Sequence, residues 1–312
     1  MKLKTLLPTT LAILMLAACG GKMQRGSAAD NNYDFEAIAK AIDGCEYLWN
    51  FCNGAAVVIK NGEKFYIDLQ GRRVERPQEK EEPDKLTTDY KDGKYGFKDQ
   101  DGKIIIPHRF RFAADFSEGM ALVVNEKMLV GYINTKGELV VPYTYYMPSE
   151  RNGNDFHEGI CAVVVDGARE WFSYIDKTGK LAFPGVFSMA GDFSEGLAAV
   201  STTDKREGDM DFRSGYIDRS GKMVIELPDR WWGRKFQDGV AQIQNRNSCY
   251  IIDKKGKQLF KVDSEAIYAG SDIVYSEGLS LVYGKGKYEG KRGFMDKKGR
   301  ITFRLGDTET YE

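Results

Sequence analysis

The sequence is poor in the residues and motifs on which most enzymes depend. Only 2 of its 312 residues are histidines. It contains neither a Gly-x-Ser-x-Gly nucleophile motif nor a glycine-rich phosphate loop, so no nucleophile is found with a base beside it. The histidines also lie far from any cysteine motif with the spacing of a zinc site. We therefore expect no catalytic residue, no bound metal and no cofactor.

Helical periodicity and an excess of one charge are lacking as well. After residue 45 the apolar residues do not recur at helical spacing, which favours an all-β fold. The 45 basic and 46 acidic residues give a formal net charge of -1. A nearly neutral surface argues against general binding of nucleic acid. No apolar run long enough to span a membrane follows the N-terminal one.

Glycine, by contrast, is abundant and recurs in two patterns. The first pattern is an aromatic or β-branched pair, then Asp or Asn, then a Gly three places later, which is a hairpin signal. The Asp side chain can accept hydrogen bonds from N–H groups inside the turn, and the Gly supplies a positive φ. The seven copies begin at Tyr66, Phe97, Tyr132, Tyr174, Tyr216, Ile251 and Phe294.

The second pattern is Phe-x-Glu-Gly followed by small and apolar residues. Its Gly opens a short apolar strand, its aromatic residue is expected in the core, and small residues such as Ala121 allow neighbouring units to approach. The copies begin at Phe116, Phe156, Phe193, Phe236 and Tyr275, with a weaker one at Phe51.

The two patterns alternate with a period from the thirties to the low forties. A repeat of that size indicates stacked supersecondary units that share a core. We predict an all-β tandem array of about seven hairpin or three-stranded repeats. An open curved array and a propeller-like ring both fit the pattern, and the sequence leaves that choice open.

These repeats resemble the WG/KWG repeat family of bacterial proteins. In that family a Trp-Gly or Tyr-Gly precedes the Tyr-Ile-Asp strand. Tyr95-Gly96, Gly131, Gly215 and Gly293 hold this place here, whereas the Trp is missing and Ser173 and Cys249 replace two of the glycines. The resemblance covers roughly residues 51–303. It implies tandem β repeats and supplies no catalytic residues.

The N-terminus resembles a bacterial lipoprotein signal peptide. Lys2 and Lys4 precede a short apolar stretch that ends in Leu16-Ala-Ala-Cys19. Cys19 would carry the lipid, with palmitate among its acyl chains, and anchor the protein in a bilayer. Gly20 follows Cys19, so an inner-membrane retention signal of the Asp type is absent. We expect a cell-envelope location, in the outer membrane if the cell is Gram-negative. A cleaved signal peptide with an incidental cysteine is the alternative.

Composition divides the chain into five segments. We expect a signal peptide over 1–18, a flexible tether over 19–33 and a short capping helix over 34–44. The repeat domain follows over 45–305, and a polar tail over 306–312.

Two polar segments interrupt the repeats. Arg72–Lys94 is dense in charge and is expected to be an exposed insertion, although a degenerate repeat copy could lie within it. Lys205–Arg213 is expected to be a smaller loop, such as the tip of a long hairpin.

Four cysteines remain after Cys19. An exported protein can form disulfides. Cys45 and Cys52 are close in sequence and flank the first strand, so we predict a local bridge between them. Cys161 and Cys249 lie on apolar strands and are interpreted as buried small hydrophobes.

One carboxylate recurs in each copy of the second pattern and should form a row along one edge. Such a row could attract cations or a basic partner, and paired carboxylates could hydrolyse glycosides. The simpler interpretation is that they are turn residues, each solvated singly. These residues are Glu118, Glu158, Glu195, Asp238 and Glu277.

Two aromatic clusters occupy connections between repeats. Trp232 aligns with Phe112 and Met189 and is expected in the core. Trp231 is an extra residue, which is either exposed or, as the simpler interpretation, folded back on its own repeat. Tyr143, Tyr145 and Tyr146 form the second cluster. Exposed aromatic residues beside polar groups can stack on sugars or anchor a protein partner.

The sequence therefore favours a noncatalytic binding or scaffolding lipoprotein of the bacterial envelope. It would recognise an envelope protein or glycan through the loops between repeats, with Trp231, Trp232 and the three tyrosines as binding residues. An envelope-associated hydrolase with a carboxylate site on one rim is the alternative.

Overall fold

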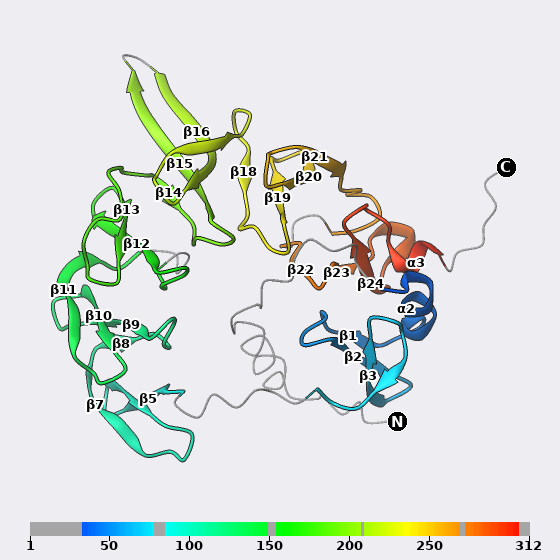
Figure 1. The fold of residues 1–312 in the computed structure, drawn as a ribbon, viewed down its shortest axis with the longest axis horizontal. Helices are drawn as coiled ribbons and strands as arrows, with labels where there is room; N and C mark the ends of the chain where they lie inside the picture. The colour runs from blue at the N-terminus through cyan, green and yellow to red at the C-terminus, as the bar shows by residue number, and fades with distance from the viewer. Residues whose placement is uncertain (1–32, 78–84, 149–153, 207–208, 269–271, 306–312) are drawn as a thin grey trace, which may run out of the picture. The chain divides into compact units, whose positions relative to one another are not determined.

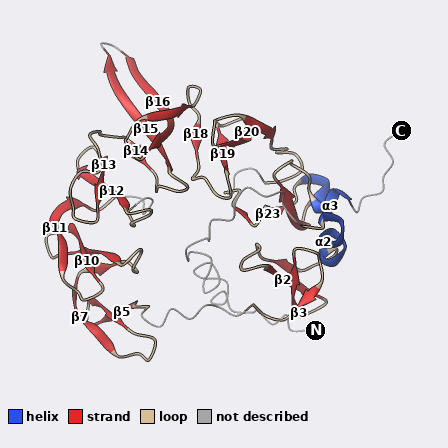
Figure 2. Ribbon diagram, viewed as in Figure 1, coloured by secondary structure: helices blue, strands red, loops and turns tan. Residues whose placement is uncertain are grey.

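A computed structural model describes residues 33–77, 85–148, 154–206, 209–268 and 272–305. The described residues are almost entirely strands and turns (Figures 1 and 2). They divide into two compact units. The first comprises the chain up to Glu81, Val274–Asp296 and the chain from Arg300, and the second comprises Glu82–Ile273 and Lys297–Gly299. The all-β class with tandem antiparallel sheets is confirmed.

The second unit holds five of the repeats, which we number by their place in the chain. The second and third repeats are β5 (Thr87–Lys91), β6 (Lys94–Lys98), β7 (Ile104–Phe110) and β8 (Phe112–Ala113), β9 (Met120–Val124), β10 (Leu129–Asn134), β11 (Leu139–Tyr146). The fourth is β12 (Ile160–Asp166), β13 (Trp171–Asp176). The fifth repeat is β14 (Met189–Ala190), β15 (Leu197–Arg206), β16 (Asp209–Asp218) and β17 (Met223–Glu226). The sixth repeat is β18 (Trp232–Gly233), β19 (Val240–Gln244), β20 (Cys249–Asp253) and β21 (Gln258–Lys261).

Each repeat of the second unit is an antiparallel meander in chain order. The third and fourth repeats are joined into one six-stranded sheet, because β11 is long enough for Tyr146 to pair with Val164 of β12. In the fourth repeat the outermost strand is replaced by isolated bridges at Leu181 and Phe187.

The first unit contains the first and the last repeat. Its elements are α2 (Phe35–Ile42), β1 (Tyr47–Leu48), β2 (Ala55–Lys60), β3 (Glu63–Asp68), β4 (Arg73–Val74), β22 (Tyr275–Ser276), β23 (Leu279–Tyr283), the 3-10 turn η2 (Gly286–Tyr288), β24 (Arg292–Asp296) and α3 (Thr302–Leu305). The two repeats share one core, in which the rings of Phe51 and Phe294 lie 4.9 Å apart.

The helix α2 has the signals that its sequence predicts. Asp34 is its N-cap and accepts a hydrogen bond from the backbone N–H of Ala37, at 2.9 Å. Phe35, Ile38 and Ile42 recur at helical spacing and are buried in the core of the first unit. The predicted helix over 34–44 is therefore observed two residues shorter at its C-terminal end.

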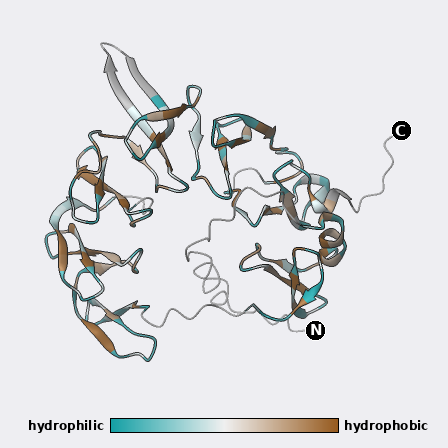
Figure 3. Ribbon diagram, in the orientation of Figure 1, coloured by the Kyte–Doolittle hydropathy of each residue, from teal (hydrophilic) through white to brown (hydrophobic). Residues whose placement is uncertain are grey.

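Apolar side chains concentrate on the central strands, and polar residues on the turns (Figure 3). The aromatic residue of the second pattern is buried in every copy except Phe116, which is partly buried and packs against the core. The small residues Ala121, Ala162 and Ala198 are likewise buried. Each repeat thus buries one face of its short sheet against a neighbouring repeat, as stacking requires.

The prediction that Arg72–Lys94 is an exposed insertion is wrong for its C-terminal part. Thr87–Lys91 forms β5, which pairs with β6 through the turn at Asp92-Gly93, and Leu86 is buried. The segment therefore contains a degenerate first strand of the second repeat. Its charged residues do not indicate a strand in the sequence, but an edge strand tolerates charged residues on its solvent side. The loop predicted at Lys205–Arg213 belongs to the long hairpin β15–β16, which projects in Figure 1.

Candidate functional site

The carboxylates of the second pattern sit in two-residue hairpin turns. In the third repeat, Ser117 and Met120 exchange backbone hydrogen bonds across Glu118 and Gly119, whose φ values are 49° and 81°. Two successive positive φ values define a type I′ turn. The same pair of left-handed conformations recurs at the other members of the row: Glu158, Glu195, Asp238 and Glu277, and also at Asn53 of the weak copy.

These carboxylates bind the next repeat. Glu118 accepts hydrogen bonds from the backbone N–H groups of Glu158 and Gly159, at 2.9 and 2.8 Å. Glu158 accepts one from Gly196 at 2.9 Å. Glu195 likewise accepts from Gly239, and in the first unit Glu277 accepts from Gly54 of the first repeat, at 2.8 Å. The bonds to Glu118, Glu158 and Glu195 therefore each tie one turn to the equivalent turn of the next repeat, whereas the bond to Glu277 ties the last repeat to the Asn53-Gly54 turn of the first. The simpler expectation of singly solvated carboxylates does not hold.

A cation from the first pattern pairs with four carboxylates of the row: Glu118, Glu158, Glu195 and Asp238. The residue after the turn Asp reaches back to the carboxylate of the preceding repeat: Lys177 lies 3.2 Å from Glu118, and Arg219 lies 3.6 Å from Glu158. The remaining pairs are Lys254–Glu195 and Lys297–Asp238. We call the carboxylate, the N–H of the next Gly and this cation the inter-repeat clasp.

In the third repeat the clasp keeps the Glu118 carboxylate ionised. Partial burial disfavours the charged form of Glu118, but the N–H of Gly159 and the Lys177 ammonium outweigh it. The pKa of Glu118 therefore lies below its usual value. A general acid for glycoside hydrolysis needs the opposite shift. The carboxylates that suggested a hydrolase are thus occupied in joining repeats.

The predicted aromatic residues do not gather at one place. Trp231 packs on Tyr250, with ring centroids 5.5 Å apart, against the core of the fifth and sixth repeats. Trp232 lies on β18, beside a Gly233 that faces Tyr216. The expectation of a core Trp232 is therefore wrong, because alternation along β18 directs the Gly233 position inward and Trp232 away from it. The alternative of a Trp231 folded back on its own repeat is the one observed.

The three tyrosines of β11 alternate in the same way. Tyr143 and Tyr145 are partly buried and pack against two different core clusters. Tyr146 is 44% exposed, and its ring lies against Gly167, where an added Cβ would come within 2.7 Å of it. Of the five predicted binding residues, Tyr143 lines a depression on the surface of the described residues.

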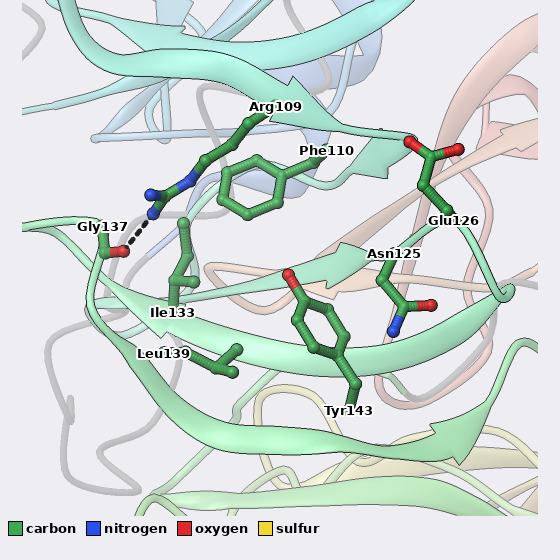
Figure 4. Close-up of a pocket in the computed structure, with 8 residues that line it drawn as sticks. All are labelled: Arg109, Phe110, Asn125, Glu126, Ile133, Gly137, Leu139 and Tyr143. Atoms are coloured by element: carbon green, nitrogen blue, oxygen red, sulfur yellow. Dashed lines mark hydrogen bonds between the residues drawn. The ribbon is translucent and has the colours of Figure 1, made fainter.

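That depression lies between the second and third repeats, within the second unit (Figure 4). Its volume is about 450 Å³. Phe110 and Ile133 form its apolar floor, and Arg109 donates a hydrogen bond of 2.6 Å to the carbonyl of Gly137 at its edge. The lining residues are Arg109, Phe110, Asn125, Glu126, Ile133, Gly137, Leu139 and Tyr143.

Polar groups surround the apolar floor. Partial burial raises the pKa of the Tyr143 phenol, while the Arg109 guanidinium opposes that rise, so the phenol stays protonated and can donate. The side-chain oxygen of Asn125 accepts from the N–H groups of Lys127 and Leu129, which fixes the orientation of its amide. The site thus combines an aromatic wall with fixed polar groups.

A second depression of about 430 Å³ adjoins the first and shares Glu126 with it. Lys94 forms an ion pair with Glu126. Tyr90 is 63% exposed and stands 4.8 Å from the ring of Tyr95, which in turn contacts Phe112. Its lining residues are Tyr90, Gly93, Lys94, Tyr95, Arg111, Phe112 and Glu126. We call the two depressions together the 2–3 groove.

Sequence reasoning missed most of the 2–3 groove. Tyr90 and Lys94 lay in the supposed insertion, and Arg109 and Arg111 follow a strand whose neighbour had not been recognised. A signal was present in the alternation of Tyr90, Tyr95 and Phe112 with charged residues. Recognising β5 as a strand would have brought these side chains to one side of the second repeat.

The predicted disulfide between Cys45 and Cys52 is not formed. Glu46, Trp49 and Cys52 bond in turn to Ile59, Val57 and Ala55, so the chain between the two cysteines is extended. At about 3.3 Å per residue the Cα atoms are on the order of 20 Å apart, whereas a bridge needs less than about 7 Å.

The other two cysteines are buried free thiols. Burial raises the pKa of Cys249 to about 11. Cys161 lies 3.1 Å from the Tyr132 hydroxyl, and burial raises its thiol pKa as well. Both are therefore unreactive thiols near neutral pH.

Cys19 lies outside the described residues. Among those described, no helix is long and apolar enough to cross a membrane. The same part of the chain contains no cluster of three or more His, Cys, Asp or Glu arranged to hold a metal ion.

Several solved structures resemble the chain loosely. A computationally designed protein, Ika8, has a TM-score of 0.43 and 13% identity, covering 83% of this chain and 85% of its own. BamB from Moraxella catarrhalis has a TM-score of 0.38 and 10% identity, with coverages of 75% and 80%. The WD40 β-propeller domain of Doa1 has a TM-score of 0.36 and 13% identity, and the match covers 76% of this chain and 84% of that domain's chain. Scores this low assign neither a shared fold nor a function.

The sequence itself matches a repeat family. A search of curated proteins found no match. The family described as WG containing repeat matches residues 95–127, 131–167 and 172–205. These spans run through the second to fifth repeats. Residues 95–205 of this chain therefore consist of WG-type β repeats.

Proposed function

We propose that this chain is a noncatalytic binding or scaffolding lipoprotein of the bacterial cell envelope. The 2–3 groove would receive the partner, an envelope protein or glycan. Lipid attached to Cys19 would hold the repeats at a membrane, and the segment 19–33 would serve as the tether. In a Gram-negative cell that membrane would be the outer membrane.

One observation carries the binding proposal. The repeated carboxylates are used in the inter-repeat clasps, whereas the 2–3 groove presents side chains that the repeat architecture does not require. Tyr90 is exposed, and Arg111 and Asn125 line the groove beside it. Aromatic and arginine side chains in a depression are the residues that most often dominate binding energy.

The binding proposal is tested by crosslinking in the native envelope and identifying the attached molecule. We expect Tyr90→Ala and Tyr143→Ala to reduce capture while the melting temperature changes little for Tyr90→Ala, because that ring is mostly exposed. Tyr283→Ala is the matched control, since Tyr283 is 44% exposed on β23 of the first unit. Equal capture by all three variants would place the binding site elsewhere.

The anchoring proposal needs a separate experiment. Cells grown with labelled palmitate should label the wild-type protein and not the Cys19→Ala variant, which should also leave the membrane fraction. Labelling that persists in the variant would exclude Cys19 as the lipid site. The Cys45→Ala variant is a control for cysteine loss, because Cys45 is a half-buried free thiol.

A further inference from the structure

The charges around the 2–3 groove are unbalanced. Its lining residues include the cations Lys94, Arg109 and Arg111 and a single carboxylate, Glu126. Lys94 is paired with that carboxylate. The two guanidinium groups therefore face the groove without a lining carboxylate to neutralise them, although the chain as a whole has a formal net charge of -1.

Three aromatic side chains of the groove are in contact. Tyr90 and Tyr95 have ring centroids 4.8 Å apart, and Tyr95 meets Phe112 edge-on at 5.4 Å. Tyr143 and the buried Phe110 line the other depression. Such rings offer flat apolar faces to a ligand, while the arginines offer planar pairs of donors.

From this combination we infer that the 2–3 groove binds an acidic saccharide, with sugar rings on the tyrosines and a carboxylate at the arginines. This inference rests on the proposed binding function and names its ligand class. A sugar presents flat C–H faces and polar edges together, which matches rings and donors that alternate over a short distance. A folded protein partner would need about 800 Å² on each side, whereas these two depressions are small and polar.

The test uses an oligogalacturonate of four residues as the acidic ligand and its methyl ester as the matched neutral one. We expect calorimetry to detect the acid binding more tightly than the ester, with an affinity that falls as salt is added. Arg111→Gln should weaken the acid about tenfold, the loss of one contact of 1.4 kcal/mol, and Tyr90→Ala should weaken both ligands. Arg246→Gln is the control, since Arg246 is an exposed arginine in a turn of the sixth repeat.

The other outcomes are distinguishable. Equal binding of acid and ester would overturn the role of the arginines. Binding of a poly-glutamate peptide in place of the oligosaccharide would overturn the ligand class and leave the binding function standing. If neither binds at millimolar concentration, the acidic-saccharide site is excluded; crosslinks that also map outside the 2–3 groove would exclude the proposed site as a whole.

A second inference concerns one joint between repeats. The residue before Glu in the second pattern is Ser in three copies, Ser117, Ser194 and Ser276. In two of them its hydroxyl donates to the carbonyl of the next repeat's aromatic residue. Ser117 does so to Phe156 at 2.7 Å, and Ser194 to Phe236 at 2.6 Å. In the fourth repeat this slot holds His157, whose Nε2 lies 3.3 Å from Oδ2 of Asp192 in the approach to the fifth repeat.

The surroundings of His157 are mostly acidic. The charged groups that face it are Asp192, Asp155 and, at the opposite sign, Lys235. The other oxygen of Asp192 is buried and has no hydrogen-bond partner within the described chain. An acidic partner with an unsatisfied oxygen is stabilised by a protonated imidazole more than by a neutral one.

We propose that the joint between the fourth and fifth repeats weakens as the pH rises, while the serine joints beside it do not. The bond to Asp192 raises the pKa of His157 above its ordinary value of 6.5. A raised pKa means that this contribution to stability is complete below 6.5 and is lost as the pH rises through the folded-state value. Loosening would expose the contact between these two repeats at alkaline pH.

The test compares thermal unfolding of the wild type and His157→Ser between pH 5.5 and 8.5. The serine variant has the same residue as the neighbouring joints. We expect the melting temperature of the wild type to fall by about 2 °C more over this range than that of the variant. His108→Gln, which removes the only other histidine, should retain the wild-type decrease.

Proton NMR gives an independent measurement on the folded protein. Its two histidine resonances can be assigned with the same variants, and that of His157 should titrate above 6.5. Parallel unfolding curves for the wild type and His157→Ser, or a His157 resonance that titrates below 6.5, would overturn the proposal.

Discussion

The two kinds of glycine turn in this protein use the same residue types for different purposes. In the Tyr-Ile-Asp turns the carboxylate serves its own turn: Asp218 accepts hydrogen bonds from the N–H groups of Ser220 and Lys222. In the Phe-x-Glu-Gly turns the carboxylate serves the next repeat, as Glu158 does with Gly196. One turn makes a hairpin, and the other joins hairpins into an array.

The difference follows from geometry. In the Tyr-Ile-Asp turn the backbone of the five residues from Asp218 to Lys222 bends around the Asp218 side chain. The N–H groups of Ser220 and Lys222, two and four residues later, therefore point at its carboxylate. In the two-residue turn at Glu158 the N–H groups of Glu158 and Gly159 point to Glu118 of the preceding repeat, at 2.9 and 2.8 Å, and not to the turn's own carboxylate. Its longer side chain therefore extends to the neighbouring turn.

Removing the aromatic residue before a Glu-Gly turn should have the largest effect on stability. Phe236 is fully buried and packs edge-on against Tyr216 of the preceding repeat, at 4.8 Å. We expect Phe236→Ala to lower the free energy of unfolding by about 3–5 kcal/mol. Leu259→Ala, on the exposed outer strand β21 that follows an Asp turn, should cost less than about 1 kcal/mol. Chemical denaturation measures the free energy of unfolding of both variants. Comparable losses would contradict the inference that the buried aromatic residue holds the two repeats together.

Exchanging the two carboxylates for asparagine tests the comparison directly. Glu158→Asn should cost about 2 kcal/mol, because a charge-assisted bond to Gly196 and the pairing with Arg219 are lost together. Asp218→Asn should cost about 0.5 kcal/mol, because Asn134 already accepts the equivalent bonds in the third repeat. Asparagine tolerates the left-handed conformation at 158, as Asn53 does.

The order of the two losses is the decisive measurement. If Asp218→Asn proves the more costly change, the local turns rather than the clasps hold the array together.

The smallest expected effect is on the response to acid. The clasp depresses the pKa of Glu118, so its contribution to stability is present above the ordinary value of 4.5 and is lost as the pH falls through the folded-state value. Glu118→Gln should therefore be less stable than the wild type at pH 7 and should lose less stability on acidification. The two unfolding midpoints should converge at low pH, where both side chains are neutral. A constant difference at every pH would show that the carboxylate charge is not involved.

Much of the fold could be predicted from the sequence because the repeats are local. Tyr216 to Gly221 forms its turn from hydrogen bonds within that segment, so its residues specify it wherever it occurs. The short helix was readable for the same reason, from Asp34 and the spacing of Phe35, Ile38 and Ile42. The strand β5 was missed because its identity depends on pairing with β6 and not on its own charged residues.

The candidate site was far less predictable. Tyr143 was anticipated, whereas Tyr90, Arg109, Arg111 and Glu126 were not, because they come from two repeats and meet only when those repeats pack. Trp231 was the most individual residue of the sequence, yet the structure uses it against Tyr250 in a core. The sequence shows that an aromatic residue is present, but whether its side chain is buried depends on the strands that pack beside it.

The sequence alone determined the turns and their period, since each turn is satisfied by atoms close to it in the chain. Packing decided what those turns do to one another. The reach of Glu118 to Gly159, the burial of Trp231 and the assembly of the 2–3 groove all depend on residues from different repeats. Such contacts form only when the apolar faces of two repeats pack together, because local hydrogen bonds within a turn do not specify which residue of another repeat will lie beside it.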